Sequence, residues 1–329
     1  MSSKIKHPKG LYFLFAVEMW ERFGYYGMRS ILVLYMVNYL LFSTEKAGQI
    51  YGWYTGLVYL MPLLGGYIAD RYLGARQCIL FGAILMVLGY FAMAFEPLPF
   101  FYTALGLIIL GNGFFKPNIS TVVGQLYKGN ESAKDAGFTI FYMGINLGAF
   151  FSPFVCGTLG EKLNYHYGFA AAGVGMLIGT IIYLFGQWKY LGNAGLFPYN
   201  SSKIEEKPID KPLTNEEKKK VAVIFILMFF SIFFWASFEQ AGSSLTLFAK
   251  ESTNRVIPFL NWEFPASYFQ AINPLFIILL APLLSDLWLN LQSVNKEPSA
   301  PAKFAFGLGF VAFGFVLMVI ASTLADTYG

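Results

Sequence analysis

The segment VAVIFILMFFSIFFWASF (residues 221–238) contains 18 residues and no charged side chain. A helix of about 20 apolar residues crosses the hydrocarbon core of a bilayer. Comparable apolar stretches recur along the whole chain, in which 56% of the 329 residues are hydrophobic and only 13% are charged. Soluble domains carry about 25% charged residues. Because long unbroken apolar stretches in lipid favour helices, we predict an all-α membrane protein with many transmembrane helices.

Nine spans are expected along the chain, and the second group begins after a polar interruption. The spans lie at roughly 11–41, 47–69, 76–95, 99–127, 136–160, 166–190, 221–249, 265–290 and 302–324. Residues 192–220 are dense in Lys, Glu and Pro, which is typical of a solvated linker. We therefore predict an N-terminal six-helix bundle (1–191), a linker (192–220) and a partial second bundle of three helices (221–329).

The distribution of basic residues predicts the orientation in the membrane. Most of the 23 Lys and Arg residues lie in the N-terminal tail, the even-numbered loops and the linker. Basic loops face the cytoplasm in multi-pass proteins. The sequence thus predicts a protein of the cell (plasma or inner) membrane, surrounded by lipid, with a cytoplasmic N-terminus and linker. The net charge of +4 reflects these loops, so we expect no nucleic-acid partner.

Six ionisable side chains lie inside the expected spans. Four are in the first span, and the others are in the fourth and seventh: Glu18, Glu21, Arg22, Arg29, Lys116 and Glu239. Such residues cost about 2.5–3.5 kcal/mol each on insertion scales and commonly mark substrate or ion pathways. At about 100° per residue, Glu18, Arg22 and Arg29 share one face of the first helix. A buried ion-pair network that only fixes the packing is the alternative, but charges on three different helices favour a cavity that handles a solute.

Polar residues on other spans extend this set. Tyr142 and Asn146 stand four residues apart on the fifth span, as do Trp235 and Glu239 on the seventh, while Asn273 precedes a proline on the eighth. Taken singly, each of these side chains is explained by packing or hydrogen bonding between helices. Together with the charges they describe a cavity for a zwitterionic solute, with cations for its carboxylate and amides or carboxylates for its ammonium group.

No pattern of an enzyme, metal site or cofactor site is found. The sequence lacks an HExxH pair, a nucleophile elbow and a phosphate-binding GxxxxGK[ST] loop. Cys78 and Cys156 both fall in apolar segments, which does not indicate a zinc site. We expect no cofactor other than coupling protons. Because His7 and His166 lie at span ends or outside them, any proton carrier is expected to be a buried carboxylate.

Six segments resemble the proton-dependent oligopeptide transporter family or the major-facilitator superfamily that contains it. EMWERFGYYGMR (18–29) is similar to its ExxERFxYYG signature, and GNGFFKPNIS (111–120) with FYMGINLGAF (141–150) is similar to its second signature region. GGYIADRYLGAR (65–76) looks like the loop motif of major-facilitator proteins generally. FFWASFEQAGSSL (233–245) and YFQAINPLFI (268–277) resemble the seventh and eighth helices of the family. The resemblance implies a major-facilitator fold and proton-coupled symport of di- and tripeptides.

The resemblance also implies individual roles. Arg22, Lys116, Tyr26 and Tyr59 match positions that bind the carboxylate side of the peptide, and Asn146 and Asn273 match those that hold its amine. Glu18 and Glu21 match the carboxylates that act with Arg22 and Lys116 in proton coupling. Arg29 and Glu239 match an extracellular gating pair, Trp235 matches a pocket wall, and Tyr142 lies near the cavity in relatives.

Two alternatives to peptide symport remain open from the sequence. A related symporter could carry nitrate or another small anion, although the intact ExxER set, Lys116 and two amide positions favour a peptide. Family members have twelve core helices, so the chain resembles a fragment that lacks helices ten to twelve. A fragment without them could be a non-transporting, receptor-like protein.

Overall fold

The computed structural model describes residues 6–129, 131–198 and 214–328. Within these ranges the chain forms nine helical spans, which confirms the predicted all-α membrane fold. Seven helical segments of the described residues are long and apolar enough to cross a membrane. The first two spans fall outside this set, since the first carries four charges and the second is rich in Gly and Tyr.

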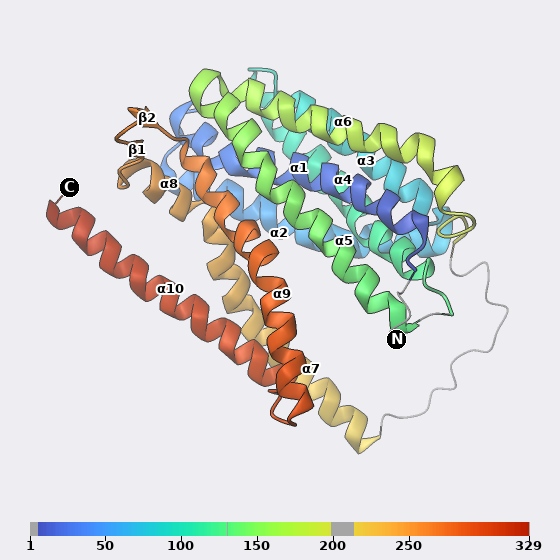
Figure 1. Ribbon diagram of the computed structural model, residues 1–329. Helices are drawn as coiled ribbons and strands as arrows, with labels where there is room; N and C mark the ends of the chain where they lie inside the picture. Colours follow the sequence, from blue (N-terminus) through green and yellow to red (C-terminus); the bar gives the residue numbers. More distant parts are fainter. Residues whose placement is uncertain (1–5, 130, 199–213, 329) are drawn as a thin grey trace. The chain divides into compact units, whose positions relative to one another are not determined.

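The first six spans comprise α1 to α6 (Figure 1). Their bounds are α1 Lys9–Asn38, α2 Thr44–Ile68, α3 Ala75–Ala92, α4 Leu98–Gln125, α5 Glu131–Ser152 and α6 Tyr165–Tyr190. Two of these spans are longer than their α-helices. A π-helical turn, Ala69–Leu73, extends α2, and two more, Pro153–Gly157 and Leu159–Leu163, extend α5.

The last three spans are less regular than predicted. The seventh consists of α7 (Asn215–Phe238), a 3-10 turn (Glu239–Gly242) and α8 (Ser244–Glu251). A short antiparallel pair, β1 (Val256–Ile257) and β2 (Trp262–Glu263), follows it. The turn Ala266–Ala271 leads into α9 (Ile272–Ser293), and α10 (Ala300–Tyr328) completes the described chain. Periodicity alone did not predict the hairpin, which Arg255 and Glu263 close with an ion pair.

Side-chain caps explain where several helices begin. The hydroxyl of Ser43 accepts from the Lys46 amide at 3.2 Å at the start of α2. At the start of α6, Asn164 Oδ1 accepts a hydrogen bond from the His166 amide at 2.9 Å. Thr214 and Glu217 form a reciprocal capping box before α7, which is a strong helix start signal. This cap explains why the seventh span begins at Asn215 and not at Val221.

The segment that follows α6 is fastened to the first turn of α3 and the last residue of α4. Arg76 is buried and donates to the carbonyl oxygens of Ala194 at 2.7 Å and Gly192 at 2.5 Å. The amide of Gly195 donates to Gln125 Oε1 at 2.6 Å. Gly192 and Gly195 have φ values of +52° and +72°, a region that glycine adopts without a steric cost.

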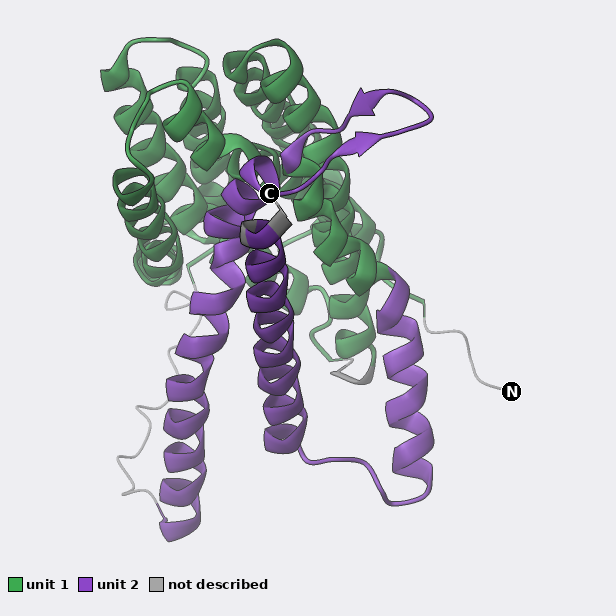
Figure 2. Ribbon diagram, turned by 90° about the vertical axis from the view of Figure 1, so that its left-hand side faces the viewer, with its two compact units in different colours: residues 1–204, 267–278 green, residues 205–266, 279–329 purple. Residues whose placement is uncertain are grey.

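Packing divides the described chain into two compact units (Figure 2). Unit 1 comprises residues 1–204 and 267–278, and unit 2 comprises 205–266 and 279–329. In unit 1, α1 lies between α5 and α6 (Figure 1), and α3 packs along α4. The predicted boundaries at 191 and 220 remain a prediction, and residues 199–213 of the predicted linker lie outside the described residues.

Close contact between α3 and α4 depends on glycine. A Cβ atom on Gly82 would lie 2.5 Å from the carbonyl oxygen of Gly111, and one on Gly111 would lie 2.7 Å from that of Gly82. These separations are shorter than van der Waals contact, so only hydrogen atoms fit there. Small residues at such crossings let helix backbones approach each other in a bilayer. The backbones of α3 and α4 therefore pack in direct contact at Gly82 and Gly111.

Candidate functional site

Three charged residues of α1 form a buried cluster in unit 1. Arg22 Nε lies 2.9 Å from Glu18 Oε1 and 2.6 Å from Glu21 Oε2. The exposed fractions of Glu18, Glu21 and Arg22 are 2%, 0% and 3%. Buried charges are tolerated when they are paired and hydrogen-bonded. The structure thus brings together the three ExxER residues that the sequence singled out.

The contacts within this charge cluster do not satisfy all of its polar atoms. Glu18 Oε2, Glu21 Oε1 and the Nη2 atom of Arg22 are buried and have no hydrogen-bond partner among the described residues. Glu21 also interacts electrostatically with Lys116 of α4. Two carboxylates and two cations therefore lie within electrostatic reach of one another, and several of their polar atoms keep capacity for a further partner.

Lys116 and Tyr59 lie together beside this cluster. The Lys116 Nζ atom is 4.8 Å from the centroid of the Tyr59 ring, within the usual range of a cation–π contact. Lys116 is half-buried and Tyr59 is exposed. Pro117 within α4 removes one backbone donor from the helix next to Lys116. The ammonium group thus lies between the buried acids and a more open aromatic surface.

Arg29 lies two turns further along α1. Its Nε atom donates to the hydroxyl of Tyr51 on α2 at 2.7 Å, and its guanidinium carbon lies 5.7 Å from the ring centroid of Tyr26. Arg29 is 4% exposed. Tyr26 is therefore adjacent to the proposed gate arginine. Its predicted role in carboxylate binding remains a prediction.

The remaining candidate residues of unit 1 lie on α5 and α9. Asn146 is buried, and its Nδ2 atom donates to the carbonyl oxygen of Tyr142 at 2.9 Å. This bond leaves the side-chain oxygen of Asn146 available to accept a hydrogen bond from a ligand. The side chain of Tyr142 is 51% exposed. Asn273 is exposed in the first turn of α9, one residue before the buried Pro274.

Trp235 and Glu239 belong to unit 2. Trp235 is 46% exposed in the last turn of α7, and its ring meets those of Phe234 and Phe238 at 5.5 Å. Glu239 is half-buried and begins the 3-10 turn that separates α7 from α8. This break in the helix was not predicted, and it occurs at the residue assigned to the gate.

Comparisons with known proteins match nearly the whole chain. A profile of the POT family matches residues 76–194 and 199–329. The uncharacterized transporter YclF of Bacillus subtilis is 35% identical, over 95% of this chain and 74% of that protein. A di-/tripeptide transporter of Lactococcus lactis subsp. cremoris is 33% identical, over 98% of this chain and 77% of its own length. The chain belongs to the POT family.

A solved structure agrees with this assignment. A POT family transporter in complex with a thioalcohol conjugated peptide superposes with a TM-score of 0.81 at 30% identity, covering 96% of this chain and 77% of that one. As a POT family member, the chain is a multi-pass membrane transporter and not an enzyme. The chain spans about three quarters of the length of these relatives.

Sequence reasoning missed several buried polar residues of this POT family chain. The hydroxyls of Tyr54 on α2 and Tyr90 on α3 are buried and have no hydrogen-bond partner among the described residues. The same holds for the Oδ1 and Nδ2 atoms of Asn112 on α4. Tyr90 interacts electrostatically with Glu21, and Tyr54 does so with Arg29. A tyrosine spaced among aromatic residues carries no sequence signal of such a position, because only helix packing decides whether its hydroxyl is buried.

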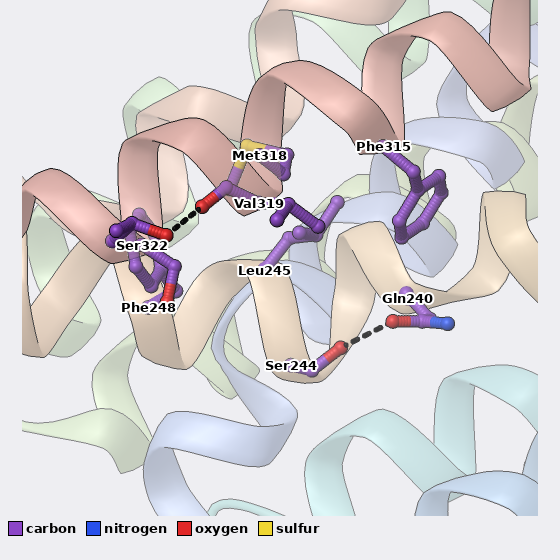
Figure 3. A pocket seen from close by; sticks show the side chains of 9 residues that line it. Gln240, Ser244, Leu245, Phe248, Phe315, Met318, Val319 and Ser322 are labelled. Atoms are coloured by element: carbon purple, nitrogen blue, oxygen red, sulfur yellow. Dashed lines mark hydrogen bonds between the residues drawn. The ribbon is translucent and has the colours of Figure 1, made fainter.

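Unit 2 of the POT family chain has a pocket of its own, and its lining residues include none of the charged cluster (Figure 3). Its volume is about 390 Å³, and residues of the 3-10 turn Glu239–Gly242, of α8 and of α10 line it. At its wall, Ser244 Oγ donates to Gln240 Oε1 at 2.9 Å (Figure 3). Thr323 Oγ1, which also lines the pocket, donates to the Val319 carbonyl at 2.9 Å. Among the described residues, no group of three or more His, Cys, Asp and Glu side chains is arranged to hold a metal ion.

Proposed function

We propose that the chain carries di- and tripeptides across the cell membrane together with protons, by alternating access. Membership of the POT family supports this, as do the di-/tripeptide transporter relative and the peptide complex of a family member. Peptide transport is the function that these relatives share with the chain. No finding favours nitrate transport or a receptor role, so neither is proposed.

The buried cluster of Glu18, Glu21 and Arg22 is the observation that carries the proton coupling. Its two carboxylates share one guanidinium at 2.6 and 2.9 Å while all three residues are at most 3% exposed. Removing one partner from a buried ion pair typically costs about 3–5 kcal/mol. Because an unpaired buried charge is this costly, binding of a further charged group to the cluster requires a matching change in the charge of Glu18, Glu21 or Arg22.

A proton provides that change. When one carboxylate takes up a proton, the cluster loses a negative charge and holds Arg22 or Lys116 less tightly. The cation is then available to the carboxylate of a peptide. Proton and peptide each favour the binding of the other, as reciprocity of coupled binding requires. This cycle moves both solutes in one direction.

The other candidate residues orient the peptide in this proposal. Tyr26, Tyr59, Arg22 and Lys116 take its carboxylate end, and Asn146 and Asn273 take its ammonium group through their side-chain oxygens. Tyr142 and Trp235 line the cavity between them. Arg29 and Glu239 close it on the outside. The basic residues of the tail and loops support a cytoplasmic N-terminus and a cytoplasmic linker at residues 192–220 in this proposal.

Uptake into proteoliposomes tests the proposal. The full chain is reconstituted, and labelled dialanine uptake is followed with and without an imposed inward proton gradient. Accumulation above the external concentration only with the gradient is expected. Facilitated equilibration without accumulation would contradict proton coupling, and competition by nitrate but not by tripeptides would contradict a peptide substrate.

A further inference from the structure

Unit 1 contains three fully buried polar side chains that come from three different helices. Tyr54 of α2, Tyr90 of α3 and Asn112 of α4 are 2%, 0% and 0% exposed. The two hydroxyls and both polar atoms of the amide have no hydrogen-bond partner in the part of the chain that the structure describes. Buried polar groups nearly always have a partner, either in the protein or in ordered water. We call Tyr54, Tyr90 and Asn112 the buried polar set.

Tyr90 lies beside the charge cluster of α1. A Cβ atom on Gly24 would be 3.1 Å from Tyr90 Cε2, and Gly24 follows Glu21 by three residues, which places both on one side of α1. Tyr90 interacts electrostatically with Glu21 and Arg22, and Tyr54 does so with Tyr90. The Tyr90 hydroxyl does not hydrogen-bond Glu21, whose Oε1 atom is also buried without a partner among the described residues. Ordered water commonly bridges polar groups that are related in this way.

Asn112 points into the same interior. A Cβ atom on Gly111 would meet α3, and one on Gly113 would meet α2. Asn112 lies between these two faces of α4 and is completely buried, so its amide points between α2 and α3 and not to lipid. It also stands one helical turn before Lys116, which interacts electrostatically with Glu21. All three members of the buried polar set therefore surround the space next to Glu21.

Glu21 needs different hydrogen-bond partners in its two charge states. A carboxylate accepts hydrogen bonds, whereas a protonated carboxyl group also donates one. Arg22 and Lys116 are donors alone, so they suit the charged form of Glu21 and offer no acceptor to the O–H group of the neutral form. A tyrosine hydroxyl, an amide and a water molecule can each donate or accept. The buried polar set thus supplies the kind of partner that a carboxyl group requires when it gains and loses a proton.

We propose that Tyr54, Tyr90 and Asn112 bind a small cluster of ordered water molecules inside unit 1, and that this water positions Glu21 in both of its charge states. While Glu21 is charged, a water O–H group donates to Oε1. When Oε1 takes up a proton, its new O–H group donates to the oxygen of that water, which turns its own hydrogen atoms towards the tyrosine hydroxyls and the Asn112 oxygen. The inference rests on the proposed function, in which a carboxylate of the cluster takes up the coupling proton.

Glu18 provides the alternative. Its Oε2 atom is buried and has no hydrogen-bond partner among the described residues, and two neighbouring carboxyl groups can share one proton. In that case Glu18 accepts from protonated Glu21, and the buried polar set has no part in coupling.

Radiolytic footprinting of the full chain in detergent detects the water directly. A brief X-ray exposure converts bound water into hydroxyl radicals, which oxidise adjacent side chains that mass spectrometry then identifies. Tyr54 and Tyr90 are expected to be labelled several-fold faster than Tyr183, because buried water lies beside polar groups that need a partner. Tyr183 is the matched control, since it is 0% exposed and its hydroxyl donates to the Arg76 carbonyl at 3.3 Å. Equal labelling of the three tyrosines would overturn the water site.

Melting temperatures of phenylalanine variants give a second measurement of the water site. Removing a buried hydroxyl that has a partner destabilises a protein, whereas removing one that has none relieves a cost. Tyr54→Phe and Tyr90→Phe are therefore expected to lower the melting temperature in detergent, as Tyr183→Phe is by losing its bond to the Arg76 carbonyl. An unchanged or raised melting temperature in both variants would contradict bound water.

Two transport assays test the role in coupling. Tyr90→Phe and Asn112→Leu are expected to lower gradient-driven dialanine accumulation about tenfold, the loss typical of one hydrogen bond to a charged group. Counterflow exchange of dialanine should change much less, whereas a merely structural defect lowers both. Tyr183→Phe is the control and should keep the parent's ratio of accumulation to counterflow. Parent-like ratios in both variants would overturn the positioning role and favour a proton shared with Glu18.

The two levels of the proposal fail in different ways. Footprinting and melting temperatures need no transport, so they report the water site even if the parent protein takes up no peptide, a result that would overturn the proposed function. If the parent accumulates dialanine and the Tyr90 and Asn112 variants do so equally well, the positioning role alone fails. Should Tyr90→Phe not fold, Asn112→Leu and the footprint of the parent protein decide the inference.

Discussion

Arg29 donates a hydrogen bond of 2.7 Å from its Nε atom to the hydroxyl of Tyr51, joining α1 to α2 across 22 positions of sequence. Arg29 is 4% exposed and Tyr51 is 3% exposed. A guanidinium that is out of water requires such acceptors. The residue assigned to the outer gate is therefore already oriented by a neighbouring helix of its own unit.

Replacing Tyr51 by Phe should weaken this orientation. We expect Tyr51→Phe to lower the free energy of unfolding by about 1.5–3 kcal/mol, as for other hydrogen bonds to charged groups, and to reduce uptake. Thermal unfolding in detergent and proteoliposome uptake measure the two effects. Tyr12→Phe is the control, because the Tyr12 side chain is 53% exposed. Equal melting temperatures for the two variants would contradict the prediction.

The gate assignment can be tested by exchanging the charges. Arg29→Glu and Glu239→Arg alone should each reduce dialanine uptake strongly, since each places two like charges at the proposed gate. The double variant restores opposite charges and should recover part of the transport. A double variant no better than the weaker single variant would show that the two side chains do not act as a pair.

Lys116 should be needed for coupling more than for substrate movement. Lys116→Ala leaves Arg22 to bind the peptide carboxylate but removes one of the two cations that balance Glu18 and Glu21. We expect counterflow exchange of dialanine to persist and gradient-driven accumulation to be lost. Counterflow is measured in vesicles preloaded with unlabelled peptide. Accumulation surviving in this variant would move the coupling elsewhere, with Glu239 the next candidate.

Arg22 should behave differently from Lys116. Arg22→Ala removes the partner of both Glu18 and Glu21 and the proposed ligand of the peptide carboxylate. Peptide affinity itself should fall, so that counterflow and accumulation are lost together. Arg22→Lys should not restore them, because an ammonium group does not reproduce the planar fork of a guanidinium. Full counterflow in the alanine variant would contradict a direct role in binding.

The close contact between α3 and α4 predicts that alanine substitutions at two glycines of α4, Gly111 and Gly106, have different effects on stability. A Cβ on Gly111 would lie 2.5 Å from Met86 Cγ and 2.7 Å from the Gly82 carbonyl, whereas one on Gly106 meets no atom within 4 Å. Gly111→Ala should therefore destabilise the bundle by about 1–3 kcal/mol through overpacking. Gly106→Ala should leave stability unchanged or slightly improve it. Melting temperatures of the two variants in the same detergent decide the matter.

The sequence by itself determined the helical spans and the composition of the charged cluster. Hydrophobicity over about 20 residues is a local property, so the nine spans could be located without any tertiary information, to within a few residues at most ends. The four-residue spacing of Glu18 and Arg22 likewise placed them on one face of the first helix, where the structure pairs them at 2.9 Å. Membership of the POT family was readable from local motifs for the same reason.

Tertiary structure decided which distant residues complete these local features. The hydrogen bonds from Arg29 to Tyr51, from Arg76 to the Ala194 carbonyl and from the Ser267 amide to Glu161 join residues separated by 22 to 118 positions. Helical periodicity defines which face a side chain occupies but not which helix covers that face. Covering depends on how closely two backbones approach, and here glycines such as Gly82, Gly111 and Gly157 allow approaches that any Cβ atom would block. Those distances exist only once the helices have packed.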